Sequence, residues 1–142
     1  MANLKPLIRV RKHAIEQKQK YLAGLYRESE DLERQKQKLI EEFAHERRTI
    51  QEMGADMLSF FGAYSKAVDK RREELESAIA RLESRIVIAQ DDLRQTYADL
   101  RRIEIVQEKR DREEAQRLEK KEAQELDEIG LTRFMAQQGE SY

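Results

Sequence analysis

The sequence has no cysteine or tryptophan, one proline, five glycines and few aromatic residues. Without cysteine, the chain can form neither a disulfide framework nor a thiolate zinc site, which fits a cytoplasmic protein. Because aromatic residues make up only 6% and apolar residues are thinly spread, we do not expect a layered core around a sheet. A charged fraction of 40% is typical of long helices instead, and we expect one all-α domain.

Long apolar runs and a charge of one sign are also missing. The longest aliphatic run, at residues 86–89, is far below the roughly 20 residues that a membrane-spanning helix needs. The start, "MANLKPLIRVRK", lacks the apolar segment of a secretory signal. The 28 basic and 29 acidic side chains nearly cancel, which argues against a nucleic-acid-binding protein. We therefore expect no membrane insertion and no nucleic-acid partner.

Residue sets that carry catalysis are not found either. His13 and His45 are the only histidines, and on one helix they would lie roughly 48 Å apart, too far to share a metal ion. No nucleophile stands near a base, and the glycines near the middle of the chain lack the lysine of a phosphate-binding loop. We expect no enzyme activity, no metal and no cofactor.

Two heptad registers organise the apolar residues. The first runs from Leu4 and Ile8 through Leu32, Leu39 and Phe43 to Met57, and most of its core positions are apolar. The second register is filled almost as well, by Phe61, Val68, Leu75, Ile79, Leu82, Ile86, Ala89, Leu93, Leu100 and Ile103. Two helices that share one seam are therefore predicted.

A reversal between the two registers turns this pattern into an antiparallel coiled-coil hairpin. Asn3 is a candidate helix cap, and Pro6 is tolerated in a first helical turn. Gly54 and Gly62 are the densest pair of helix-weakening residues and mark the turn. We expect helix one at about 4–55, the turn at about 54–63, helix two at about 64–129, and a short C-terminal tail.

Helix two should outlast helix one. Leu4 is expected opposite the region around residue 114, so that the last 25 or so residues have no partner helix. Leu126 and Ile129 continue a narrow apolar stripe there, which an outside surface could cover. Alternatively, Gly130 ends the helix in a left-handed cap and Leu131 folds back on Leu126.

Three segments together resemble the FliJ family of bacterial flagellar export proteins: "LKPLIRVRKHAIEQKQKYLAGL", "FFGAYSKAVDKRREELESAIARLE" and "RLEKKEAQELDEIGLTRF". The resemblance spans nearly the whole chain, and its most specific piece is the acidic closing segment. It implies a coiled-coil hairpin, similar to the central stalk of rotary ATPases, that sits in the hexameric ring of the flagellar type III export ATPase. It also implies contacts with the cytoplasmic domain of the membrane-embedded export gate and with export chaperones, at the inner face of the cell membrane, and a link to chemotaxis.

The resemblance also implies two sets of partner-binding residues. For the ATPase ring they are Glu122, Glu125, Leu126, Asp127, Glu128, Ile129, Arg133, Arg9 and Arg11. For the export gate they are Leu39, Glu42, Arg71, Leu75 and Ala78, of which Leu39 and Leu75 are also seam positions. The sequence departs from some family members in having no tryptophan near the turn and in carrying Glu42 and Glu46 where aromatic residues can occur.

Other classes of function stay open at this point. The turn residues Met57, Leu58, Phe60, Phe61 and Tyr64 either pack across the turn or form an exposed tip, as in a holdase chaperone that grips clients there. A structural adaptor or a homodimeric coiled coil is the third interpretation. An unbroken rod would need a second chain to cover its seam, whereas a hairpin covers its own.

Overall fold

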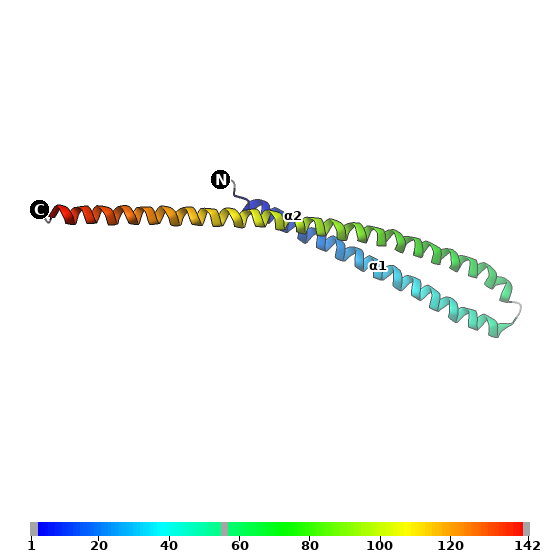
Figure 1. Cartoon of the computed structure of the whole chain (residues 1–142). Coiled ribbons are helices and arrows are strands. Elements are labelled where there is room, and N and C mark those ends of the chain that lie inside the picture. Colours follow the sequence, from blue (N-terminus) through cyan, green and yellow to red (C-terminus); the bar gives the residue numbers. More distant parts are fainter. Residues whose placement is uncertain (1–2, 55–56, 141–142) are drawn as a thin grey trace. The chain divides into compact units, whose positions relative to one another are not determined.

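The computed structural model describes residues 3–54 and 57–140 as two long helices, α1 (Lys5–Met53) and α2 (Leu58–Glu140) (Figure 1). No strand occurs in this described part of the chain. The chain divides into two compact units: residues 13–97, and residues 1–12 together with 98–142. The all-α class and the antiparallel helical hairpin predicted from the heptads are thus confirmed.

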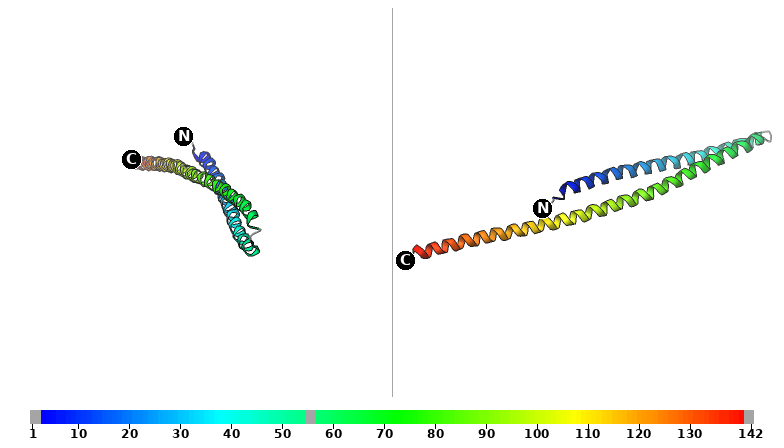
Figure 2. Two further views of the ribbon diagram at one scale, coloured as in Figure 1. Left: turned by 90° about the vertical axis from the view of Figure 1, so that its right-hand side faces the viewer. Right: turned by 90° about the horizontal axis from the view of Figure 1, so that it is seen from above.

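In the unit of residues 13–97, α1 and α2 run antiparallel and side by side (Figures 1 and 2). The buried side chains are those that the two registers predict: Ile15 and Leu25 from α1, and Val68, Leu75, Ile79, Leu82, Ile86 and Ala89 from α2. Leu22 and Leu32 pack against the centre of this cluster. Because only one stripe of each helix is buried, the hydrophobic effect stabilises the pair along a single seam.

Polar side chains interrupt the seam at defined heights. Lys18 occupies a core position of α1, and its Nζ lies 3.0 Å from Asp92 Oδ2 and donates to Thr96 Oγ1 over 2.7 Å. Thr96 is the buried polar residue of the seam and donates in turn to the carbonyl of Asp92. A lysine at a core position favours the one register in which it is paired. This layer therefore fixes the height at which α1 lies against α2.

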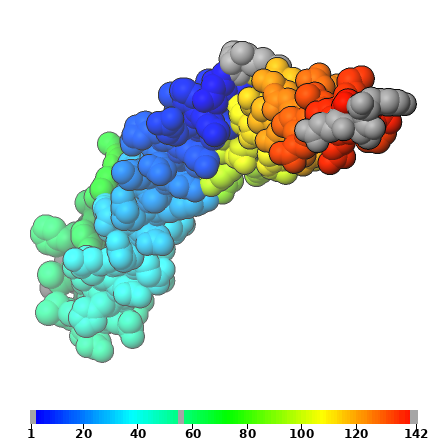
Figure 3. All heavy atoms as spheres, turned by 90° about the vertical axis from the view of Figure 1, so that its left-hand side faces the viewer, coloured from blue at the N-terminus to red at the C-terminus, as the bar shows by residue number. Residues whose placement is uncertain are grey.

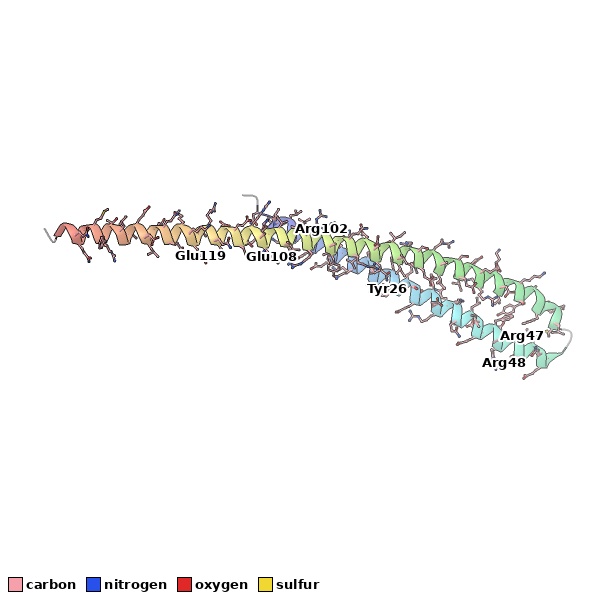
Figure 4. The ribbon with its side chains drawn as sticks, viewed as in Figure 1. Tyr26, Arg47, Arg48, Arg102, Glu108 and Glu119 are labelled. Carbon is pink, nitrogen blue, oxygen red and sulfur yellow. The ribbon has the colours of Figure 1, made fainter. Side chains whose placement is uncertain are left out.

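Tyrosines flank the seam and bridge the helices with their hydroxyls. Arg85 Nη2 donates to Tyr21 Oη over 3.2 Å, and Gln90 Nε2 donates to Tyr26 Oη over 2.6 Å. Tyr26, labelled in Figure 4, thereby ties α1 to α2. Each phenol spans the flank of the seam while its ring stays half exposed, which suits an amphipathic side chain.

The turn is shorter than expected. Gly54 has φ +99°, a conformation that favours glycine, and it ends α1 as the reversal prediction required. The predicted turn at 54–63 and helix start at 64 are wrong, because α2 already begins at Leu58 and passes through Gly62. Ala55 and Asp56 lie outside the described residues.

Aromatic stacking explains why the helix begins early. The Phe61 ring lies 5.4 Å from that of Phe43, and the Tyr64 ring lies 6.1 Å from it, measured between centroids. These contacts need helical backbone at residues 61–64, and they outweigh the cost of about 1 kcal/mol for Gly62 in a helix. Of the five turn residues, Phe61 and Tyr64 thus pack across the turn, whereas Met57, Leu58 and Phe60 are exposed.

The unit of residues 1–12 and 98–142 contains the level at which α1 begins beside α2. Asn3 Oδ1 accepts a hydrogen bond from the Lys5 amide over 3.0 Å, which confirms the predicted cap. The Leu4 amide donates to Gln107 Oε1 over 3.0 Å. Leu4 therefore lies beside Gln107, not opposite residue 114, because the short turn brings α2 alongside α1 several residues earlier. The unpaired end of α2 is correspondingly longer than the 25 residues expected.

The left-handed cap at Gly130 is also wrong. The helix continues through Gly130 to Glu140, and Gly54 has the one positive φ among the described residues. Good helix formers, among them Leu131, Arg133 and Met135, follow Gly130 and offset its cost of about 1 kcal/mol. The expected tail after residue 129 is therefore helix. Within residues 3–54 and 57–140, neither helix offers a stretch long and apolar enough to cross a membrane.

Gly24 lies inside α1 with no close neighbour, which rules out a tight approach of α2 as its explanation. A Cβ at this position would meet only the guanidinium of Arg27, at 3.9 Å. Gly24→Ala should therefore raise the free energy of unfolding by about 0.5–1 kcal/mol. Urea unfolding followed by circular dichroism measures the change. Gly62→Ala, also uncrowded, should act in the same direction, whereas Gly54→Ala should destabilise the fold; a destabilised Gly24→Ala would contradict the open environment.

The hydroxyl of Tyr64 is expected to titrate above its usual range. A hydrogen bond to Glu46 raises the pKa of Tyr64, and burial and the charges of Glu46 and Glu42 add to the effect. A pKa raised by folding favours the neutral phenol in the native state, so this contribution to stability is present below about pH 10 and is lost above it. Absorbance titration, with Tyr64→Phe to identify the signal, should show a lower pKa in Glu46→Gln. An unchanged Tyr64 pKa in that variant would contradict the bond.

Candidate functional site

The C-terminal extension, defined as residues 111–139 of α2, has no partner helix. It lies beyond the contact of Leu4 with Gln107, and every one of its residues is exposed. On the face seen in Figure 3, the orange and red atoms of this stretch are not covered by the dark-blue N-terminal residues. Its large apolar side chains are about half exposed or more: Leu118, Leu126, Ile129, Leu131, Phe134 and Met135. Leu126 is the most open of them, at 68%.

Most of the residues expected to bind the ATPase ring share one side of this extension. At about 100° per residue, one broad arc of the helix holds all but one of the C-terminal set: Glu122, Glu125, Leu126, Glu128, Ile129 and Arg133. Asp127 lies on the opposite side. A shallow depression of about 540 Å³ opens on this arc, lined by Glu125, Glu128, Ile129, Thr132 and Arg133. Thr132 Oγ1 donates to the carbonyl of Glu128 over 2.8 Å, which leaves the acids free.

Few charged side chains of the extension form an ion pair or a side-chain hydrogen bond in the described part of the chain. In its described residues, one ion pair joins Arg117 to Glu114 at 3.8 Å, and none involves Glu122, Glu125 or Glu128. Because α2 continues to Glu140, these acids are also remote from the last helical turn, where the negative end of the helix dipole acts. The helix dipole therefore does not disfavour these acids.

Phe134 and Met135 belong to this surface but were not among the residues expected to bind. Continued as a helix, residues 129–136 present apolar side chains on two opposite sides, Ile129 on one and Leu131, Phe134 and Met135 on the other, with Thr132 and Arg133 between them. Apolar side chains on two opposite sides of a helix need more than one surface to cover them. The helical projection of the sequence could have revealed this pattern.

Arg9 and Arg11 do not join the acidic set. Both are exposed on α1, but residues two apart point about 160° away from each other on a helix. Since Leu4 lies beside Gln107, Glu122 is at least about 22 Å further along α2. The expected ring-binding residues thus lie apart: Arg9 and Arg11 on opposite sides of α1, and the acidic and apolar set on α2.

The residues expected to contact the export gate do come together, in the unit of residues 13–97. Leu39, Glu42, Arg71 and Leu75 line one depression of about 210 Å³, together with Gln35 and Lys38. Leu75 is only 3% exposed and belongs to the seam, as its heptad position indicates. Ala78 lies one helical turn away and is half-buried. The accessible chemistry of this depression comes from its charged rim.

The rim charges are held by neighbours on their own helices. Lys38 Nζ lies 3.9 Å from Glu42 Oε1, and Arg71 Nη1 lies 3.4 Å from Glu74 Oε2. Exposed pairs of this kind contribute about 0.2–1 kcal/mol each, so a partner can exchange them at little cost.

Chemistry beyond binding finds no support in the side-chain arrangement. Within residues 3–54 and 57–140, no group of three or more acidic or histidine side chains converges to hold a metal ion. His13 and His45 are both exposed on α1. The depressions lined by Ile129 and by Glu42 are shallow and face solvent, unlike the enclosed clefts that usually hold small molecules.

A comparison with protein-family models places the chain. The model described as "Flagellar FliJ protein" matches residues 1–139, nearly the whole length. No curated protein and no solved structure matches the chain. The match covers both helices and the C-terminal extension and agrees with the segments that resemble this family. The chain therefore belongs to the FliJ family and is a flagellar export-related protein.

Proposed function

We propose that this chain is a non-enzymatic stalk of the flagellar export apparatus, and that its C-terminal extension docks into the hexameric export ATPase. The observation that carries the proposal is the extension itself, in which every residue from 111 to 139 is exposed and has no helix of the same chain to cover it. Exposed apolar patches on a soluble surface usually mark an interaction site. The family gives the partner its identity, and the extension gives the surface.

A ring suits a segment with apolar residues on two opposite sides better than a flat partner surface does. A flat surface covers one side of a helix, whereas a channel covers Ile129 and, on the opposite side, Leu131, Phe134 and Met135 at once. A single helix inside a sixfold ring also meets six identical subunits unequally. It can therefore bind one state of a subunit better than another and shift its nucleotide cycle, without any chemistry of its own.

The second contact proposed is with the cytoplasmic domain of the export gate, through the depression around Glu42 and Arg71. Its support is geometric, because residues from both helices that the family resemblance selects line the same small surface. The stalk would then connect the ATPase ring with the gate at the inner face of the cell membrane. Contacts with export chaperones extend the same proposal.

A holdase function is the alternative that a specific observation favours. Met57, Leu58 and Phe60 remain exposed at the turn, with Phe60 at 74%. Methionine and phenylalanine side chains adapt to varied apolar clients. Suppression of aggregation by the isolated protein, lost in Phe60→Ser, would favour this alternative over the stalk.

Removal of residues 122–142 tests the ATPase contact. Because residues 122–139 are all exposed, the melting temperature of the hairpin should stay nearly unchanged. Binding to the purified ATPase, measured by interferometry, and any stimulation of ATP hydrolysis should be lost. Full stimulation by the truncated chain would refute the docking, and unfolding of that chain would mean that the extension acts as an internal clasp.

Charge reversal in the depression tests the gate contact. Glu42→Lys combined with Arg71→Glu should weaken binding to the gate's cytoplasmic domain by about tenfold or more, because each partner charge then meets its own sign. Helicity should persist, since both side chains are exposed. Glu30→Lys with Arg94→Glu makes the same charge change on exposed positions outside the depression and serves as the matched control. Unchanged binding by the first pair of substitutions would reject this surface.

A further inference from the structure

Three cations at the start of α1 form what we call the basic edge: Lys5, Arg9 and Lys12. Their spacing of four and three residues places them in one stripe on the helix surface. All three are exposed, and none takes part in an ion pair or side-chain hydrogen bond in the described residues. Residues 3–12 contain no acidic residue at all. The nearest acidic residue on the same helix is Glu16, one turn after Lys12, and no ion pair joins the two in the described residues, so the basic edge keeps a net positive charge.

A matching stripe lies on the C-terminal extension. The acidic stripe consists of Leu118, Glu122, Glu125 and Ile129, whose spacing of four, three and four residues keeps them on one face. Both glutamates are exposed and have no ion pair in the part of the chain that the structure describes. The two flanking apolar side chains are about half exposed. The stripe thus combines negative charge with apolar surface that lacks a cover.

These two stripes cannot meet within one molecule. The Leu4–Gln107 contact fixes α1 against α2, and the uninterrupted helix carries Glu122 about 22 Å beyond that level. At physiological ionic strength the Debye length is about 8 Å, so charges at this separation are largely screened from one another. Both stripes belong to the same compact unit, and no residue of either stripe forms an ion pair in the described part of the chain.

We propose that the occupant of the acidic stripe, before the ATPase engages it, is the basic edge of a second copy of this chain. If two extensions lie antiparallel, the α2 of one copy runs parallel to the α1 of the other, because α1 and α2 are antiparallel within each copy. Glu122 then lies beside Arg9 of the second copy, and Glu125 beside Lys12 of that copy. The two glutamates are three residues apart, and so are the two cations. The contact is made twice and is self-complementary, as a twofold interface requires.

The pairing has a consequence for export. It covers Leu118 and Ile129, which belong to the extension that is proposed to enter the ATPase ring. The dimer is thus a holding form, and the ring competes with the second copy for the same stripe. The self-association stands on the charges of this chain alone, whereas its competition with the ring rests on the proposed function.

A charge-swap experiment tests the pairing with the full-length chain only, so its outcome does not depend on the ATPase. Sedimentation velocity is measured over a range of protein concentrations at about 0.01 M salt, where the Debye length is about 30 Å, and at about 1 M, where it is about 3 Å. The unaltered chain should dimerise at low salt and dissociate at high salt. The variants Arg9→Glu/Lys12→Glu and Glu122→Arg/Glu125→Arg should each raise the dissociation constant tenfold or more, with unchanged helicity.

The decisive result is rescue. In an equimolar mixture of the two variants, the altered basic edge of one meets the altered acidic stripe of the other, and the two unaltered surfaces meet as before. The dimer should therefore return. It should also form in a chain that carries all four substitutions. Arg81→Glu/Arg94→Glu, on exposed positions of the other unit, is the control and should dimerise like the unaltered chain. A chain that stays monomeric at low salt, or a dimer that the mixture fails to restore, overturns the proposal. ATPase binding by monomeric variants is a separate measurement and reports on the proposed function.

Discussion

The whole account depends on the register of one apolar seam between two helices of unequal length. Lys18 is satisfied only at the height where Asp92 and Thr96 face it, and the apolar layers of Leu25, Leu82 and Ile86 fit at that same register. Once the register is set, it also fixes which residues of α2 lie beside the first residues of α1. Residues 111–139 of α2 are then left exposed, without a helix to pack against.

The composition of the extension agrees with this division. Continued past Ile103, the seam positions of α2 are occupied by Gln107, Arg110, Glu114, Arg117, Lys121, Gln124 and Glu128, all of them polar. The apolar heptad pattern of α2 therefore ends at the level where α1 begins. Further along α2, the apolar residues occupy other positions of the helix. A surface patterned in this way does not continue the coiled coil with a third helix of the same kind. The proposed partners, a ring and the charged edge of a second copy, differ in kind from such a helix.

The seam and the turn could be predicted because period and backbone geometry leave few alternatives. Apolar residues at heptad spacing choose one face of each helix, and Gly54 supplies the positive φ that the reversal needs. The ends of α2 could not be read in the same way. A glycine costs a helix only about 1 kcal/mol, so neighbouring interactions determine whether the helix continues through it. At Gly62 the stacking of Phe61 on Phe43 keeps the chain helical, and at Gly130 the good helix formers that follow do so. The candidate surfaces could be predicted only in part from the sequence. The resemblance selects Glu42 and Arg71, but only the alignment of α1 along α2 shows that they line one depression. The same alignment separates Arg9 from Glu122.

Hydrogen exchange of the backbone amides, read along α2 with and without the hexameric ATPase, tests the central claim most directly. In the isolated chain at moderate salt, amides of residues 111–139 should exchange much faster than those around Leu82 and Ile86, because no tertiary contact protects the extension. Addition of the ATPase should slow exchange in 111–139 and leave the seam unchanged. Strong protection of the extension in the monomer, or no change on adding the ATPase, would contradict the account.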